Sequence, residues 1–298
     1  MTMNFLHRLK NPKKSKITNT VILAPIPALL VGAIVMSSNK ISPFVYGQNL
    51  ICYLILGSFL HFFSAKSVRI RYSKVGIMMP ILCCIAVACT FFDSGLENVH
   101  RWLTFGSFRF YISSIVLPCL IIHLGVLMQK ESVVFPVAIA ALVILMLTLQ
   151  PDASQTSAFA VSIAFLVWIQ TKNRLLKYGI ALWSIGFIVF SWIHIDGLVA
   201  VAHVEDILFL AKDMGIAWFV LGIVSLGLLL VPFLCFSHAP KLARSVGLYY
   251  IVTLASSFFG NFPVMFMGFG ISPIIGYQLA MFLLLRENLY VRHEHISG

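Results

Sequence analysis

The sequence predicts an all-α, polytopic membrane protein with about ten transmembrane helices and both termini in the cytoplasm. Sixty per cent of the 298 residues are hydrophobic and only 10% are charged, whereas soluble domains carry about 25% charged residues. A soluble core could not use this much apolar surface without exposing it. The length of the apolar runs and the alternation of charge between them lead to the same fold class.

Runs of about 17–23 predominantly apolar residues are long enough to cross a bilayer. The predicted spans are 18–36, 48–65, 74–92, 109–128, 132–149, 155–171, 176–194, 214–236, 244–260 and 263–285. They define one transmembrane domain over 18–285, between a basic cytoplasmic tail (1–17) and a second cytoplasmic tail (286–298). The basic N-terminus lacks a small-residue cleavage site after its apolar run, so we interpret it as a retained tail.

The last predicted span is interrupted by helix-breaking residues, namely Pro263, Gly268, Gly270, Pro273 and Gly276. A broken transmembrane helix is tolerated where protein or a water-filled cavity covers the freed backbone groups. Small residues also allow two helices to approach closely. The pattern therefore predicts either a cavity wall or close helix packing.

Charge alternates sharply between the connecting segments. Segments on the side of the N-terminus hold 17 of the 21 Lys and Arg residues, and the opposite side holds the other 4, namely Lys40, Arg101, Arg109 and Lys212. Seven of the 10 acidic residues lie on that opposite side. The positive-inside rule makes the first side cytoplasmic. The net charge of +11 therefore reflects topology, and we expect no nucleic-acid partner.

The first long outward loop leads into the stretch 98–123, NVHRWLTFGSFRFYISSIVLPCLIIH. Arg101 offers a planar donor fork for phosphate, and Trp102 an amphipathic ring suited to the membrane interface. A turn at Gly106 then leads into an apolar run. The pair predicts either a site for an anionic headgroup or an ordinary interfacial anchor.

The second long outward loop, 194–213, carries the densest cluster of ionisable residues: His194, Asp196, His203, Glu205, Asp206, Lys212 and Asp213. Its apolar centre favours a short helix in the interface, with Glu205 and Asp206 at an edge that faces headgroups. The alternative is a solvated loop whose charges keep it out of the membrane.

Asp152 follows Pro151 at the outer end of the fifth span, where it is predicted to cap the sixth span. The six cysteines lie inside apolar runs, and none pairs with a His at metal-ligand spacing. No Walker loop, GxGxxG or HExxH motif is present. Nucleotide and metallopeptidase chemistry therefore have no support in the sequence.

Four segments, in order, resemble motifs of the SEDS family, the FtsW/RodA-type proteins of bacterial cell-wall synthesis. RWLTFGSFRF with Ser113 is similar to the family's Arg-Trp-Ile…Leu-Gly…Gln-Pro-Ser-Glu signature. LQPDASQT is similar to Leu-Gln-Pro-Asp-Leu-Gly-Thr, and HVEDILFLAKDMG to His-Thr-Asp-Phe-Ile-Phe…Glu-Glu-Leu-Gly. FPVMFMGFGIS resembles Leu-Pro-Phe…Ser-Tyr-Gly-Gly-Ser. The resemblance covers roughly residues 95–285, and the family has the same ten-span topology.

The resemblance implies a glycosyltransferase of the cytoplasmic membrane that polymerises lipid II at the outer face. Its essential acid falls on Asp206 or Glu205, as general base. Arg101, with Lys212, would compensate the departing pyrophosphate. Trp102, Asp152 and His203 complete the candidate substrate-binding residues. A class B penicillin-binding protein and membrane lipids are the expected partners; no cofactor is evident, although a divalent metal would be compatible.

The sequence also departs from the family's pattern. Ser114 and Leu117 stand where the family has Glu and Lys, Tyr111 and Ile112 replace its Gln-Pro, and the loop before the eighth span is short. These losses favour a second hypothesis, a non-catalytic scaffold that recruits a transpeptidase. A lipid-precursor flippase is a third hypothesis, suggested by the broken last span.

Overall fold

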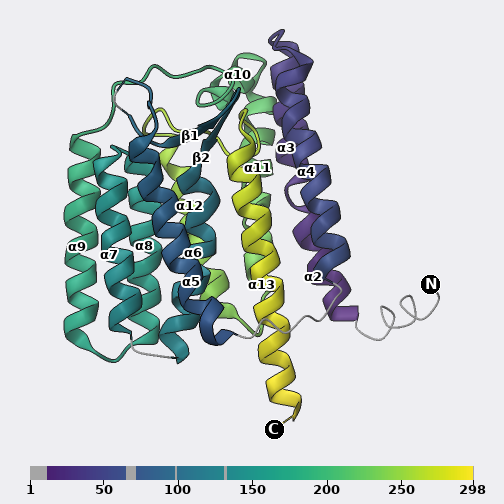
Figure 1. The fold of residues 1–298 in the computed structure, drawn as a ribbon. Helices are drawn as coiled ribbons and strands as arrows, with labels where there is room; N and C mark the ends of the chain where they lie inside the picture. Colours follow the sequence, from purple (N-terminus) through teal and green to yellow (C-terminus); the bar gives the residue numbers. More distant parts are fainter. Residues whose placement is uncertain (1–11, 65–71, 98, 131–132, 298) are drawn as a thin grey trace.

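The computed structural model describes residues 12–64, 72–97, 99–130 and 133–297, and it confirms a polytopic, helical architecture (Figure 1). The helices are α2 (Pro12–Leu23), α3 (Ile26–Ser38), α4 (Pro43–Ser64), α5 (Tyr72–Cys89), α6 (Ile112–Lys130), α7 (Val134–Leu149), α8 (Ala153–Gln170), α9 (Arg174–Ile193), α10 (Ile207–Asp213), α11 (Ile216–Leu228), α12 (Pro240–Ser256) and α13 (Ile271–Ser297). Two 3-10 turns, η1 (Thr90–Phe92) and η2 (Val231–Leu234), and two strands, β1 (Trp102–Phe105) and β2 (Phe108–Tyr111), complete the described elements.

Six helical segments of the described residues are long and apolar enough to cross a membrane, and two shorter apolar helices accompany them. Each of the ten predicted spans overlaps at least one of the observed helices, while the number of spans that cross the membrane and their orientation stay predictions. α2 begins and α13 ends at the end of the bundle opposite β1, β2 and α10 (Figure 1). Residues 1–11 of the predicted basic tail lie outside the described residues, as do the predicted inner cations Lys66, Arg69 and Arg71.

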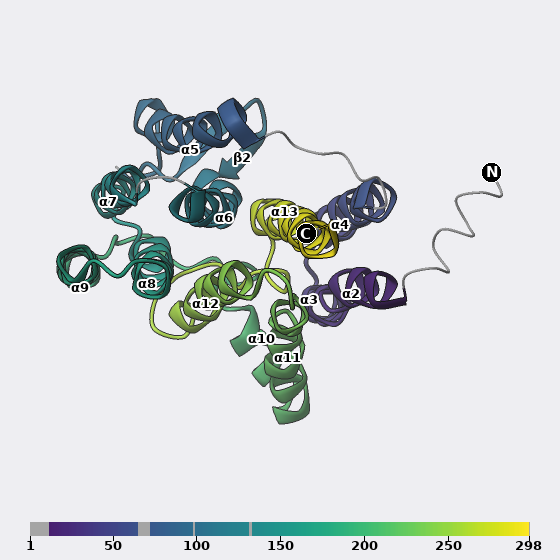
Figure 2. The same ribbon diagram turned by 90° about the horizontal axis from the view of Figure 1, so that it is seen from below.

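Two neighbourhoods of helices meet at α13. α8 packs against α6, α7, α9 and α12, while α3 packs against α4, α10 and α11. α13 packs against both α4 and α6, and the view along the bundle places it between these groups (Figure 2). The outward faces of the peripheral helices are apolar; on α9, for example, the exposed side chains include Leu175, Leu182, Ile185, Val189 and Ile193. Such faces suit hydrocarbon as a solvent.

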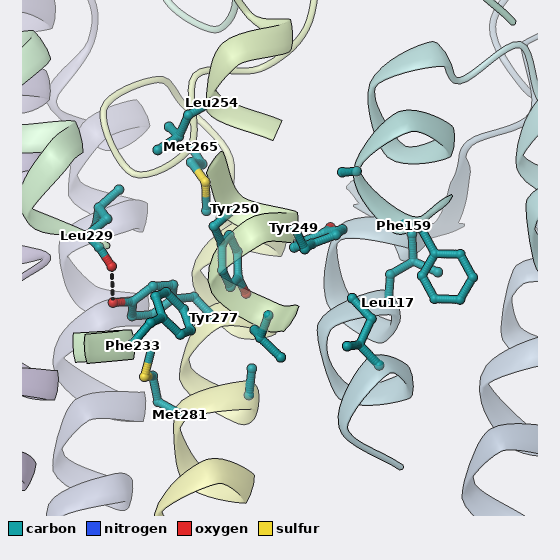
Figure 3. Close-up of a cluster of buried hydrophobic side chains, with 14 of the residues drawn as sticks. Leu117, Phe159, Leu229, Phe233, Tyr249, Tyr250, Leu254, Met265, Tyr277 and Met281 are labelled. Atoms are coloured by element: carbon teal, nitrogen blue, oxygen red, sulfur yellow. Dashed lines mark hydrogen bonds between the residues drawn. The ribbon is translucent and has the colours of Figure 1, made fainter. Parts of the chain in front are cut away.

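An aromatic cluster fills the core where η2, α12 and α13 meet (Figure 3). The rings of Phe233 and Tyr250 stack with their centroids 5.5 Å apart, and Tyr277 lies 5.2 Å from Tyr250. The Tyr277 hydroxyl donates a 2.8 Å hydrogen bond to the carbonyl oxygen of Leu229 (Figure 3). This bond satisfies a buried polar group that would otherwise cost free energy.

The prediction that a helical span begins at residue 263 was wrong, because residues 261–270 form a largely buried loop before α13. The Asn49 amide of α4 holds this loop by donating to the Gly268 carbonyl (2.8 Å) and accepting from the Gly270 N–H (3.1 Å). Gly268 itself lies so close to Val204 that a Cβ would meet the Val204 carbonyl oxygen at 2.3 Å. Phe266 adopts a positive φ of 65°. Gly268 therefore serves close packing, whereas Pro263 and Pro273 line a small cavity, so both alternatives from the sequence are found in this segment.

Replacing Asn49 with alanine is expected to lower the free energy of unfolding by about 1–3 kcal/mol, because the buried Gly268 carbonyl and the partly buried Gly270 N–H lose their partner. The measurement is the thermal unfolding midpoint of the purified protein in detergent. Asn39→Ala is the matched control, since Asn39 is an exposed residue whose side-chain amide donates to the Val35 carbonyl of its own helix end. Equal midpoints for the two variants would contradict this role of Asn49.

Candidate functional site at the outer helix ends

The stretch after η1 forms a β-hairpin, which the all-α prediction did not include. β1 and β2 pair antiparallel, and the predicted turn at Gly106 is confirmed by its φ of 60°. Asp93 fixes the hairpin to the end of η1, because its carboxylate accepts from the Thr104 N–H at 2.8 Å and from the Gly95 N–H at 3.2 Å. These backbone hydrogen bonds hold the pKa of Asp93 below its usual value. The predicted helical segment 109–128 was therefore wrong at its start, where residues 109–111 belong to β2.

Arg101 lies at the base of this hairpin and is only 4% exposed. Its Nη2 donates to the Asp196 carboxylate and to the Pro151 carbonyl oxygen, and its Nε lies 3.9 Å from Asp152 Oδ2. The guanidinium carbon also lies 5.8 Å from the ring centroid of Phe262. One cation therefore faces two carboxylates, which are themselves 0% and 7% exposed.

Asp152 connects this ion pair to the helices below it. Its Oδ1 accepts from the Gln155 N–H at 3.1 Å, so the predicted cap of the sixth span is confirmed. Its Oδ2 accepts a 2.5 Å hydrogen bond from the Tyr111 hydroxyl at the end of β2. Burial raises the pKa of the Asp152 carboxyl, while Arg101 and the Tyr111 hydroxyl oppose that shift.

The second outward loop contributes Glu205, whose Oε2 accepts from the Val201 N–H at 2.8 Å. Glu205 is half-buried, and this burial raises the pKa of its carboxyl above the ordinary value. The charge of Arg101 acts on the same carboxyl and lowers its pKa, so the two groups interact electrostatically across the site. The predicted short helix is present only in part, as α10, which begins after Asp206; Glu205 precedes this helix and does not lie on it, and its place in the membrane interface stays a prediction.

The other predicted site residues, Asp206, His203, Lys212 and Trp102, differ in burial and in their contacts. Asp206 occupies the N-cap position of α10, but its side chain makes no cap hydrogen bond. His203 lies on the same loop with its ring 6.1 Å from Phe269, and burial lowers the pKa of its imidazole. Lys212 is exposed at the end of α10, and Trp102 is half-buried, 6.3 Å from the Tyr111 ring.

A small cavity adjoins the ion-pair cluster, because Tyr111 and Gln155, which both donate hydrogen bonds to Asp152, belong to its lining. Its lining includes Tyr111, Ser154, Gln155, Tyr250 and Phe262. The hydroxyl groups of Ser154 and Tyr250 are buried there without a hydrogen-bond partner in the described part of the chain. Tyr111 and Phe262 line the cavity and also contact members of the ion-pair cluster. The site is therefore a buried ion-pair cluster beside a small cavity with a mainly apolar lining.

The structure brings Arg101 and Asp152 into one cluster, while the ion pairs of Arg101 among the described residues do not include Glu205 or Asp206. Sequence reasoning did not assign Tyr111 or Asp196 to this cluster. Asp196 could have been considered, because a buried arginine needs a carboxylate partner and Asp196 is one of the acids predicted on the same side of the membrane. For Tyr111 there was no signal beyond its replacement of a family glutamine.

Within the described residues, no three His, Cys, Asp or Glu side chains are arranged to hold a metal ion.

Tyr111→Phe is expected to lower the free energy of unfolding by about 1.5–3 kcal/mol, the range for a hydrogen bond to a charged group. The hydroxyl is the only change, and it leaves a fully buried Asp152 oxygen with one donor fewer. Thermal unfolding in detergent measures the effect. Tyr178→Phe is the control, because Tyr178 is 63% exposed; a Tyr111→Phe midpoint no lower than this control would contradict the prediction.

The fold is similar to that of solved structures of the Thermus thermophilus rod shape determining protein RodA. RodA matches with a TM-score of 0.67 at 16% sequence identity, over 90% of this chain and 95% of that chain. A mutant of RodA gives the same TM-score and identity, over 90% and 96% of the two chains. A chain from a peptidoglycan synthase complex that coordinates polymerization and crosslinking matches with a TM-score of 0.66 at 15% identity, over 91% and 97%. No family model and no curated protein matches the sequence. The predicted SEDS-like fold is confirmed.

Proposed function

We propose that this RodA-like chain is a peptidoglycan glycosyltransferase that polymerises lipid II at the outer face of the bacterial cytoplasmic membrane. The observation that carries the proposal is a buried arginine–carboxylate cluster beside a cavity, at the outer end of this fold. A sugar-transfer site needs a carboxylate to accept a proton and cations to stabilise a pyrophosphate leaving group. The second outward loop carries the carboxylate of Glu205, and α10, which follows it, carries the cation of Lys212.

Glu205 is our candidate general base, with Asp206 as the alternative on the adjacent position. The carboxylate would accept the proton of the acceptor sugar's hydroxyl. The freed oxygen attacks the anomeric carbon of the donor, and the bond from that carbon to the undecaprenyl pyrophosphate breaks. A base is more effective when its pKa approaches the working pH. The partial burial that raises the pKa of Glu205 supports its choice.

Two cations have different parts in this proposal. Lys212 is exposed on α10, and it is the group we assign to the departing pyrophosphate. Arg101 already pairs with Asp152 and Asp196, so we assign it a positioning role that holds the outer loops together. Its positive charge also lowers the pKa of Glu205. Trp102, Asp152 and His203 remain our candidates for contacts to substrate or its supporting residues.

The expected partner is a class B penicillin-binding protein, which would crosslink the strands that this chain polymerises. Support comes from the likeness to a chain of a peptidoglycan synthase complex that couples the two activities. Co-purification from native membranes after mild crosslinking is the direct check. A single-span transpeptidase should be recovered with the wild-type chain.

The test of the proposal is a polymerisation assay with labelled lipid II, using the protein alone and with its co-purified partner. Wild type should make glycan chains, Glu205→Gln should lose them, and Asp213→Asn, an exposed acid at the end of α10, should keep them. If Asp206→Asn loses activity and Glu205→Gln keeps it, the base is Asp206. Activity in the Glu205→Gln, Asp206→Asn double variant would refute both assignments.

The pH dependence of the assay provides a second criterion. Because the base must be deprotonated, the rate should fall as the pH is lowered through the Glu205 pKa, which lies above the ordinary 4.5. Removing the positive charge at Arg101 would raise that pKa further and move the acid limb to higher pH. If the polymerisation rate of Glu205→Gln falls at the same low pH as that of wild type, the acid limb belongs to a group other than Glu205.

A non-catalytic scaffold is the second candidate function. The engagement of Arg101 by two carboxylates favours it, since the buried guanidinium has its charge already compensated and is not exposed to a substrate. Wild-type protein that recruits the transpeptidase but makes no glycan, alone or with its partner, would select the scaffold.

A further inference from the structure

The register of the β-hairpin separates its side chains into two faces. Residues directly opposite each other in an antiparallel pair share a face, and the face alternates along each strand. The pairs Leu103↔Phe110 and Phe105↔Phe108 therefore form one face that is entirely apolar. The pairs Trp102↔Tyr111 and Thr104↔Arg109 form the other. The hairpin is amphipathic, and its polar face is the one that carries Tyr111 into the site.

The apolar face is uncovered at the tip of the hairpin. Phe105 is 62% exposed and Phe108 is 52% exposed. Both rings lean on Phe110, with centroids 6.1 and 6.5 Å away. They form a compact aromatic wedge of three rings, which water would solvate poorly.

The base of the hairpin lies at the level of the helix ends (Figure 1). β2 runs into α6 without a loop, and the candidate span Ile112–Gln129 begins at that point. The Tyr111 N–H also donates to Ser272 Oγ, at the start of α13, over 3.0 Å. Strands of four residues extend only about 13 Å. The tip therefore stays within the zone where aromatic side chains gather at membrane–water boundaries.

The charge at the tip complements a phosphate. Arg109 is exposed, and its cross-strand neighbour is the uncharged Thr104. Among the residues that the structure describes, Arg109 forms no ion pair with a carboxylate. An arginine fork beside aromatic rings suits the phosphate of a phospholipid headgroup. A partner protein is disfavoured by size, since specific protein interfaces bury at least about 1,000 Å² and this wedge offers three rings.

We propose that the hairpin tip anchors the protein in the outer leaflet, with Phe105 and Phe108 among the lipids at the headgroup boundary and Arg109 on an anionic phospholipid phosphate. Because Arg101 and Tyr111 stand at the base of the same hairpin, the anchor sets the depth of the site relative to the membrane surface. This inference is independent of the reaction proposed above.

Photo-crosslinking in nanodiscs tests the anchor. p-Benzoylphenylalanine is introduced at Phe105, at Phe108 and, as the control on the other face, at Thr104, and the products are identified by mass. The first two positions should give phospholipid adducts at several times the yield of position 104. Equal yields at all three positions, or a predominant protein adduct when the experiment is repeated in native membranes, would overturn the proposal.

The role of Arg109 is tested in the same system. Adduct yield at position 108 should rise when phosphatidylglycerol replaces part of the phosphatidylcholine. Arg109→Gln should reduce that rise by about fivefold, the effect of one cation near an anionic surface, and Arg109→Lys should retain it. A lipid dependence that is identical in Arg109→Gln and wild type would remove the phosphate contact from the proposal.

Discussion

Arg101→Met is expected to lower the free energy of unfolding by about 3–5 kcal/mol, because it leaves buried carboxylates without their counter-charge. The arginine is 4% exposed, and it serves Asp152 and Asp196 at once. Removing one member of such a cluster is far more costly than losing a surface ion pair. The measurement is thermal unfolding in nanodiscs, together with the yield of monodisperse protein.

Two further variants distinguish a charge effect from a packing effect. In an Arg101→Met background, Asp196→Asn should recover part of the lost stability, because one uncompensated charge is removed. Arg109→Gln, a cation on the same hairpin but exposed, should remain within about 0.5 kcal/mol of wild type when the nanodiscs contain phosphatidylcholine alone. If Arg101→Met unfolds at the wild-type temperature, the ion-pair cluster does not stabilise the fold.

Gly276→Ala is expected to have an effect of similar size, on the order of 3 kcal/mol, through steric overlap. A Cβ at this position would lie 2.0 Å from the Ser114 carbonyl oxygen and 3.0 Å from the Cα of Ile115. Both are backbone atoms, so α13 and α6 must move apart to admit the methyl group. That movement also strains the bond between Ser272 and the Tyr111 N–H, and with it the site.

Gly186→Ala is the matched control, since Gly186 lies within α9 and a Cβ there meets nothing within 4 Å. Alanine is favoured over glycine in a helix by about 1 kcal/mol, so this variant should be neutral or slightly more stable. Thermal unfolding of the two variants is compared in the same detergent. A Gly276→Ala midpoint equal to that of Gly186→Ala would show that the helix contact is not as close as the structure has it.

Much of the fold was predictable because its determinants are local. Apolar runs set the helices, and Pro151 followed by Asp152 marks a helix start that the structure confirms. Gly106 marks the hairpin turn, but the strands on either side were not predicted, because their aromatic residues are equally compatible with the start of the next transmembrane span. The same ambiguity placed residues 263–270 in a helix, although several backbone groups of this segment bond to the distant residues Asn49, His203 and Val204.

The candidate site was predicted only in part. Charge counting by side placed Arg101 and the acidic loop 194–213 on one face of the membrane. It could not choose which acid meets the arginine, because all seven outward acids satisfy that criterion equally. The fold selected Asp152 and Asp196 for direct contact and left Glu205 at longer range.

By itself, the sequence determined the fold class, the helical segments and the distribution of charge between the two sides, because hydropathy and helix signals act over a few neighbouring residues. Only the tertiary structure decided which groups share a buried space. Arg101 meets Asp196 across 95 positions, and Asn49 meets Gly268 across 219. Such contacts depend on how whole helices pack, and no local pattern of residues records them.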